Sequence, residues 1–172
     1  MNVCLAKHLL TTQTRVMCPG EESLGHEAVT AGTAAPGSTF VNVVRGPYGR
    51  LVGQGVERGG STVVEVNVPF EEVAAPDVIA SAIEQYQPDA LSFVHAEVVT
   101  GGSNPAQDIF KLAQKYKLIT VSDSVSAVGG EALNVDEWGV DFAVIGAQKA
   151  LAGPNGVSAV SISPRGWEFL ES

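Results

Sequence analysis

Two hydrophobic periods alternate along the chain and predict its secondary structure. Short apolar or β-branched runs predict strands at residues 39–44, 62–68, 90–95, 118–122, 141–145 and 157–163. Apolar residues at helical spacing predict helices at residues 48–57, 77–86 and 105–117. Prolines stand where the second and third helices begin, and a glycine pair ends the first. Strands that alternate with helices indicate right-handed crossovers and a largely parallel sheet, so the predicted fold class is α/β.

Length and composition favour one soluble domain that spans residues 1–172. No repeat, linker or low-complexity segment divides the chain, and a hydrophobic content of 45% argues against disorder. The formal net charge of −9 argues against nucleic acid as a partner, because nucleic-acid-binding proteins usually carry a basic patch. No apolar run reaches the roughly 18–20 residues of a membrane span, and the first residues do not follow the signal-peptide pattern.

The two cysteines, Cys4 and Cys18, are too few for a disulfide framework. This favours a reducing cytoplasm as the location of the protein. The cysteines could be metal ligands, but no second Cys or His pair lies at metal-binding spacing, so buried apolar thiols are the preferred interpretation and no metal site is predicted.

In open α/β sheets, ligands bind beyond the carboxyl ends of the strands. Asp123 directly follows one predicted strand, and the small residues after it would let a ligand approach closely. Its carboxylate could equally cap the next turn. Lys149 follows the strand at 141–145 and is flanked by apolar residues. Burial lowers the pKa of a lysine as Schiff-base chemistry requires, but a lysine that extends to the surface is the simpler interpretation of this residue alone.

The two residues together favour chemistry over either structural explanation. Lys149 lies 26 positions after Asp123 (149 − 123 = 26), so an acidic residue and a lysine end two successive strands. Pyridoxal phosphate enzymes need these two groups, because the lysine binds the aldehyde and the carboxylate keeps the pyridine nitrogen protonated.

Several motifs in the same order resemble the class V aminotransferases, which are fold-type I pyridoxal phosphate enzymes. The most specific are Val-Ser-Asp-Ser-Val-Ser-Ala-Val-Gly-Gly at 121–130, Asp-Glu-Trp-Gly-Val-Asp-Phe at 136–142, Gly-Ala-Gln-Lys-Ala-Leu at 146–151 and Gly-Pro-Asn-Gly at 153–156. The chain is most similar to the alanine–glyoxylate, serine–pyruvate and pyridoxamine–pyruvate aminotransferases. The resemblance implies the large domain of that fold, a three-layer α/β/α sandwich around a mostly parallel sheet.

The resemblance also implies residue roles and a reaction. Lys149 matches the Schiff-base lysine and Asp123 the partner of the pyridine nitrogen. Tyr48 matches an aromatic ring that stacks on the cofactor, although a core or turn tyrosine is the alternative. Gln148 matches a polar residue near the phosphate, with a helix-end or solvent contact as the alternative. The reaction would be transfer of an amino group from a small amino donor to a 2-oxo acid such as pyruvate or glyoxylate.

The phosphate loop departs from the common pattern of the family. Glu21, Glu22 and Ser23 stand where most members have a Ser-Gly-Thr-type loop at a helix N-terminus. Glutamates there would repel a phosphate dianion, although they also favour the first turn of any helix. The residues around them resemble the pyridoxamine–pyruvate branch, in which a glutamate meets the hydroxymethyl group of unphosphorylated vitamin B6. The hypothesis is that Glu21 accepts a hydrogen bond from free pyridoxal or pyridoxamine.

A second departure is Val98, where the family usually has Ser or Thr. Valine has the shape of threonine without its hydroxyl, so one cofactor contact worth about 0.5–1.5 kcal/mol is lost. The neighbouring His95 and Glu97 are expected to shape this loop rather than to transfer protons.

Against the family pattern, residues 2–10 resemble the late part of an N-terminal helix, and the small C-terminal domain that grips the substrate carboxylate is missing. None of the five arginines lies at a substrate-binding position of the family. An aminotransferase domain is therefore one hypothesis, and a non-catalytic domain that binds B6 or only a partner chain is the alternative. A homodimer is expected under either. A nucleotide-binding domain is a third possibility, but no Gly-x-Gly-x-x-Gly follows the first strand.

Overall fold

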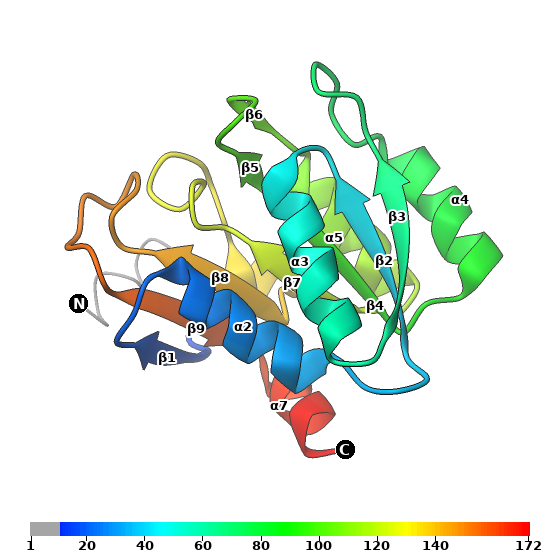
Figure 1. Ribbon diagram of the computed structural model, residues 1–172, viewed down its shortest axis with the longest axis horizontal. Coiled ribbons are helices and arrows are strands. Elements are labelled where there is room, and N and C mark those ends of the chain that lie inside the picture. Colours follow the sequence, from blue (N-terminus) through cyan, green and yellow to red (C-terminus); the bar gives the residue numbers. More distant parts are fainter. Residues whose placement is uncertain (1–10) are drawn as a thin grey trace.

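Seven strands form one sheet in the computed structural model, which describes residues 11–172 (Figure 1). Their order across the sheet is β1-β9-β8-β7-β4-β2-β3. The strands are β1 (Thr14–Cys18), β2 (Thr39–Val44), β3 (Thr62–Asn67), β4 (Ala90–Val94), β7 (Ile119–Asp123), β8 (Phe142–Gly146) and β9 (Ser158–Ile162). A separate two-stranded hairpin consists of β5 (Ala96–Glu97) and β6 (Gly102–Ser103).

The sheet is parallel over β3, β2, β4, β7 and β8, as the sequence predicts. β9 runs antiparallel to β8, and β1 runs antiparallel to β9. The change of direction follows from the connection between β8 and β9, which is a loop without the helix that a parallel crossover uses. The start of β9 therefore lies at the same edge of the sheet as the carboxyl ends of the parallel strands.

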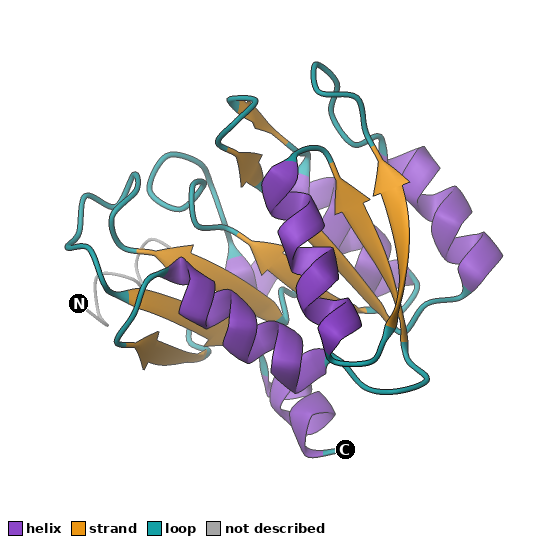
Figure 2. Ribbon diagram, viewed as in Figure 1, coloured by secondary structure: helices purple, strands orange, loops and turns teal. Residues whose placement is uncertain are grey.

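Helices cover both faces of the sheet and form the three layers of the predicted sandwich (Figures 1 and 2). The helices α2 (Glu22–Thr33), α3 (Pro47–Arg58) and α7 (Pro164–Glu171) contribute to the apolar cluster on one face. The helices α4 (Pro76–Tyr86), α5 (Ala106–Lys115) and α6 (Val135–Trp138) contribute to the cluster on the other. Since both faces are covered, the five residues of each of β4, β7, β8 and β9 are all buried.

Most of the predicted elements are confirmed with shifts of one or two residues. The helix predicted at 48–57 is α3, whose first residue is a proline and which a glycine follows. β1 was not predicted from the sequence, because it has a partly exposed pattern and lies at the edge of the sheet. The helix expected at residues 2–10 lies outside the described residues, as does Cys4. Cys18 is buried and free, as expected.

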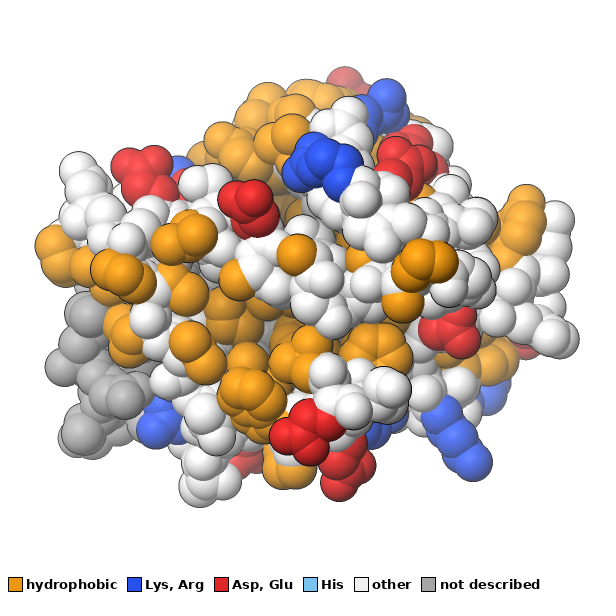
Figure 3. Space-filling model, turned by 60° about the horizontal axis from the view of Figure 1, so that its bottom comes forward, with side chains coloured by type: hydrophobic (Ala, Val, Ile, Leu, Met, Phe, Trp, Pro, Cys, Tyr) orange, Lys and Arg blue, Asp and Glu red, His pale blue; other side chains and the backbone are white. Residues whose placement is uncertain are grey.

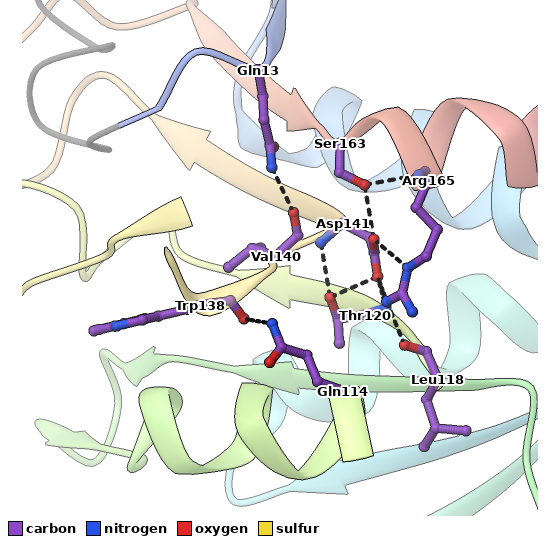
Figure 4. Close-up of polar contacts among 10 residues, drawn as sticks. Gln13, Gln114, Leu118, Thr120, Trp138, Val140, Asp141, Ser163 and Arg165 are labelled. Carbon is purple, nitrogen blue, oxygen red and sulfur yellow. Dashed lines mark hydrogen bonds and ion pairs between the residues drawn. The ribbon is translucent and has the colours of Figure 1, made fainter. Parts of the chain in front are cut away.

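The edge of the sheet opposite the carboxyl ends is held by one polar network, which we call the Asp141 network (Figure 4). Asp141 directly precedes β8 and its carboxylate accepts hydrogen bonds from Ser163 Oγ (2.8 Å), Arg165 Nε (3.0 Å) and the Thr120 backbone N–H (3.0 Å). Arg165 also donates through Nη2 to the same carboxylate and to the Leu118 carbonyl. The hydrogen bond with Asp141 raises the pKa of Arg165. The network joins β7, β8 and the start of α7.

Among residues 11–172, no helix is long and apolar enough to cross a membrane. On the face shown in Figure 3, hydrophobic side chains gather near the lower centre, and the charged side chains stand singly or in small groups around them.

Candidate functional site

A cavity of about 390 Å³ opens between α2 and α3 at the carboxyl ends of β4 and β7. This is the edge at which ligands bind in open α/β sheets. Six residues singled out from the sequence line the cavity: Glu22, Ser23, Tyr48, Val98, Asp123 and Lys149. Glu21 and Gln148 are not part of the lining. Two helices, the end of a strand, a hairpin turn and a loop, all distant in sequence, therefore converge on one volume.

Asp123 is the last residue of β7, and only 6% of its surface is exposed. Its Oδ1 accepts a hydrogen bond from the Val125 backbone N–H at 3.0 Å, so the carboxylate does support the next turn, as one of the two interpretations of the sequence held. Its Oδ2 lies 3.2 Å from His26 Nε2. The two interpretations are thus compatible, because turn support uses one oxygen and leaves the carboxylate in the cavity wall.

Lys149 lies in the loop that joins β8 to β9 and is half-buried. Backbone hydrogen bonds from Ala152 N to Lys149 O (2.9 Å) and from Gly153 N to Ala147 O (2.7 Å) hold this loop. Within residues 11–172, the amine of Lys149 makes no hydrogen bond or ion pair to another side chain. It therefore borders the cavity without a counter-ion from this part of the chain.

Gly129 brings a second loop against the lysine loop. Its φ of +95° lies in the left-handed region that favours glycine, and a Cβ there would lie 3.0 Å from the backbone of Ala150 and Leu151. Any other residue would force the two loops apart. The glycines after Asp123 thus serve to pack one loop on another, in addition to any room that they leave for a ligand.

The two glutamates at the start of α2 have different surroundings. Glu21 is the N-cap residue and is exposed, and its carbonyl accepts a hydrogen bond from Ser158 Oγ at 3.1 Å. Glu22 lies in the cavity wall, where its Oε2 accepts a hydrogen bond from Gln148 Nε2. Gln148 Oε1 is buried and has no partner in the described chain. Gln148 therefore contributes to the site through Glu22 rather than by lining it.

Gly25 lets α2 come close enough to the sheet for Glu22 to reach the cavity wall. A Cβ at this position would lie 3.0 Å from Val144 Cγ1 of β8 and 3.5 Å from Ser158 Oγ of β9. The close packing at Gly25 lets Glu22, three positions before it, and His26, one position after it, reach the ends of the strands. Glu22 and His26 are four positions apart, about one helical turn, and lie on the same face of α2.

His26 is a polar site residue that was not predicted from the sequence. It lines the cavity and contacts Asp123. Its spacing of four from Glu22 would have indicated that both lie on one face, once the start of α2 was known.

Tyr48 and Val98 lie on the other side of the cavity. Tyr48 is in the first turn of α3, and 37% of its surface is exposed. Val98 is in the turn of the β5–β6 hairpin and is 48% exposed. Both present apolar surface to the cavity, and Val98 has no hydroxyl with which to bond a ligand.

His95 and Glu97 do not line the cavity. His95 Nε2 lies 3.4 Å from Glu131 Oε2, and its backbone N–H donates to the Asp123 carbonyl at 2.8 Å. Burial lowers the pKa of His95, against the opposing effect of the Glu131 and Asp123 carboxylates. Glu97 is buried, and its Oε1 accepts a hydrogen bond from the Val99 N–H at 3.3 Å.

The sequence from residue 34 to residue 172 matches the family model described as "Aminotransferase class-V". The chain belongs to this family. Class V aminotransferases depend on pyridoxal phosphate. The resemblance inferred from the motifs around Asp123 and Lys149 is therefore confirmed at the level of the family.

Among curated class V relatives, (S)-ureidoglycine–glyoxylate transaminase of Bacillus subtilis is 29% identical over 94% of this chain and 39% of its own length. Pyridoxamine–pyruvate transaminase of Mesorhizobium japonicum is 28% identical over 91% of this chain and 40% of its own length. The crystal structure of alanine–glyoxylate aminotransferase from Nostoc sp. superposes with a TM-score of 0.94 at 28% identity, covering 98% of this chain and 45% of that one. The chain thus spans less than half the length of these relatives.

The residues around the cavity fit the pyridoxal part of the class V cofactor. The volume lies within the roughly 300–1,000 Å³ typical of small-molecule sites. Asp123 uses its two oxygens for two contacts, and a carboxylate has about four acceptor positions, so it can accept another donor. The fit is poorer for a phosphate group, because Glu22 lines the cavity at the N-terminus of α2. Among the described residues, no group of three His, Cys, Asp or Glu could hold a metal ion.

Proposed function

We propose that this chain is the cofactor-binding large domain of an aminotransferase. It would move an amino group between an amino acid or pyridoxamine and a 2-oxo acid such as pyruvate or glyoxylate. The observation that carries the proposal is that Lys149 and Asp123, from the ends of the adjacent strands β8 and β7, border the same cavity. Relatives that act on glyoxylate and pyruvate support the substrate class.

Lys149 and Asp123 would hold the cofactor at its two ends. Bound pyridoxal phosphate supplies an aldehyde that takes up amines and a ring that withdraws electrons. Lys149 Nζ would bind the aldehyde carbon and later hold the proton that leaves the substrate Cα. The unpaired state of its amine within the described chain suits this, because no carboxylate has to be displaced. Asp123 would accept a hydrogen bond from the protonated ring nitrogen.

Tyr48 would stack on the ring, and Val98 would contact it through its methyl groups only. The half-exposed phenol of Tyr48 at the cavity mouth leaves its ring face accessible for such stacking. Ser23, in the first turn of α2, also lines the cavity and could donate a hydroxyl hydrogen bond to the cofactor.

The glutamates favour unphosphorylated vitamin B6 as the bound form. Glu21, the acceptor suggested by the sequence, is exposed and outside the cavity lining, whereas Glu22 is inside it and already paired with Gln148. We propose that one of these two carboxylates accepts a hydrogen bond from the hydroxymethyl group of pyridoxal or pyridoxamine. The cavity position of Glu22 favours Glu22 for this role.

A non-catalytic B6-binding or dimerisation domain is the second candidate. Among the described lining residues, the cationic side chains are those of Lys149 and Arg58, and Arg58 is in the last turn of α3, at the opposite end from Tyr48. A group that would grip the substrate carboxylate beside Lys149 is therefore not provided by the described lining.

Borohydride reduction after incubation with pyridoxal tests the role of Lys149. We expect the reduced adduct on the peptide that contains Lys149, and no adduct at this peptide in Lys149→Ala. Lys111→Ala on α5, which is on the other side of the sheet, is the matched control and should leave the labelling unchanged. Label spread evenly over all lysines, or none at all, would contradict the cofactor role. Turnover of alanine with pyruvate or glyoxylate then separates the enzyme from the non-catalytic domain.

Binding titrations with pyridoxal and pyridoxal phosphate test the glutamates. Wild type should bind pyridoxal more tightly. Glu22→Gln should shift the preference toward the phosphate by about tenfold, since removal of one nearby negative charge is worth about 1.4 kcal/mol or more at short range. The same shift in Glu21→Gln, with none in Glu22→Gln, would assign the role to Glu21. Tighter binding of the phosphate by wild type would refute both assignments.

A further inference from the structure

His26 projects from α2 toward the carboxylate of Asp123. Its Nε2 lies 3.2 Å from Asp123 Oδ2, and the two side chains are 19% and 8% exposed. The hydroxyl of Thr30, one turn along, bonds to the His26 carbonyl at 2.8 Å, and a Cβ on Gly55 of α3 would lie 2.8 Å from that hydroxyl. The inner side of α2 is therefore closely packed against α3 beside His26, and the imidazole has a defined place.

Within residues 11–172, Asp123 is the polar side chain that His26 contacts. Its Nδ1 is buried and has no hydrogen-bond partner within residues 11–172. A buried polar atom without a partner is unfavourable for folding, so an apolar side chain on this helix face would give a more stable protein. The contact with Asp123 is what distinguishes the histidine from such a side chain.

Asp123 is thereby held from two sides. The Val125 backbone N–H reaches Oδ1 at 3.0 Å from the turn that follows β7, and His26 reaches Oδ2 from α2. Contacts to both of its oxygens restrict the rotation of the carboxylate.

We propose that His26 is a positioning residue that donates from Nε2 to Asp123 and fixes its carboxylate for the ring nitrogen of the bound B6 molecule. This role rests on the function proposed above. His26 acts through Asp123, so its effect on binding should disappear when Asp123 can no longer take part.

The contact itself is tested in the ligand-free protein by NMR of the imidazole nitrogens. The signals of His26 are identified by their loss in His26→Leu. We expect Asp123→Asn to shift them strongly, whereas Glu27→Gln should leave them almost unchanged. Glu27 is the matched control because it is adjacent on α2 and exposed, and its carboxylate has no hydrogen bond or ion pair within the described chain. Unshifted His26 signals in Asp123→Asn would refute the contact whether or not the protein binds B6.

The consequence for binding is tested with 4-deoxypyridoxine, a B6 analogue without the aldehyde, so that Lys149 chemistry does not contribute. His26→Leu should weaken its binding about tenfold, as expected for a charge-assisted hydrogen bond, and His26→Gln should recover most of the loss because its amide can donate. In the Asp123→Asn background, His26→Leu should cause no further loss. An equal loss in both backgrounds would mean that His26 contacts the ligand directly and would overturn the positioning role. Failure of wild type to bind any B6 compound would instead refute the proposed function.

Discussion

Asp123 and Asp141 are both buried, and they lie at opposite edges of the same pair of strands. Asp141 precedes β8 and accepts hydrogen bonds from Thr120, Ser163 and Arg165. Asp123 ends β7 and has two contacts, one with a backbone N–H and one with an imidazole. The first carboxylate is surrounded by donors from two segments of the chain, β7 and the start of α7, and the second retains capacity to accept another.

The difference separates structural from functional use of the same side chain. A buried carboxylate with a full set of donors stabilises the fold by joining the elements that supply them. One with fewer donors is less favourable for folding but can bind a ligand. Near Asp123, Gln148 and His26 are also incompletely hydrogen-bonded, because each has a buried atom without a partner in the described chain. The carboxyl edge of the sheet is thus less completely hydrogen-bonded than the opposite edge.

The largest effect on the free energy of unfolding should come from removing the Asp141 carboxylate, and removal of the Asp123 carboxylate gives the comparison. Asp141→Ala should lower the free energy of unfolding by about 3 kcal/mol, at the low end for a broken buried ion pair because water can reach Arg165. Asp123→Ala should change it by less than about 1 kcal/mol, since the loss of two contacts is offset by removal of a buried charge. Urea unfolding measures both. Similar losses in the two variants would contradict the division of roles.

Ser163→Ala should give an intermediate effect. Its hydroxyl accepts a hydrogen bond from the Gly166 N–H at 2.8 Å, which caps α7, and donates to Asp141 at 2.8 Å. Loss of both should cost about 1–2 kcal/mol in the free energy of unfolding. Ser81→Ala on α4 is the control, because its exposed hydroxyl bonds only within its own helix, and it should cost less than about 0.5 kcal/mol. Equal losses would mean that the Asp141 network contributes no more than a surface hydroxyl.

The smallest effect is a pH dependence at the carboxyl edge. Burial lowers the pKa of His95 below its ordinary value of 6.5. Between the two pKa values the unfolded chain binds more protons, so stability falls as pH decreases from about 6.5, by at most about 1.4 kcal/mol per pH unit for this group. His95→Gln should reduce that slope in urea unfolding between pH 7 and pH 5. An unchanged slope would show that His95 does not contribute to the acid sensitivity.

The sequence was sufficient to predict the parallel part of the sheet and the pairing of Asp123 with Lys149 at one edge. Both depend on strand periodicity and on the rule that parallel strands end together. His26 could not be found in this way, because its role depends on where α2 begins and how closely Gly25 lets it approach β8. The edge strand β1 pairs with a strand more than a hundred residues away, and its partial exposure leaves only a weak pattern.

The Asp141 network was missed for the same physical reason. Thr120 lies on β7, Ser163 and Arg165 lie at the start of α7, and no local spacing connects them to Asp141. Hydrogen bonds across the fold can be recognised only once the strand order is known, whereas the position of a residue at the end of a strand can be read from its neighbours.

The antiparallel return of β9 makes residues 142–162 a self-paired hairpin. β8 pairs with β9 along its whole length, from Phe142 with Ile162 to Gly146 with Ser158, and the Ala147 N–H continues the pairing to the Val157 carbonyl at 3.2 Å. The loop that carries Lys149 is therefore fixed at both of its ends by one hairpin, so its position beside β8 does not depend on a crossover helix.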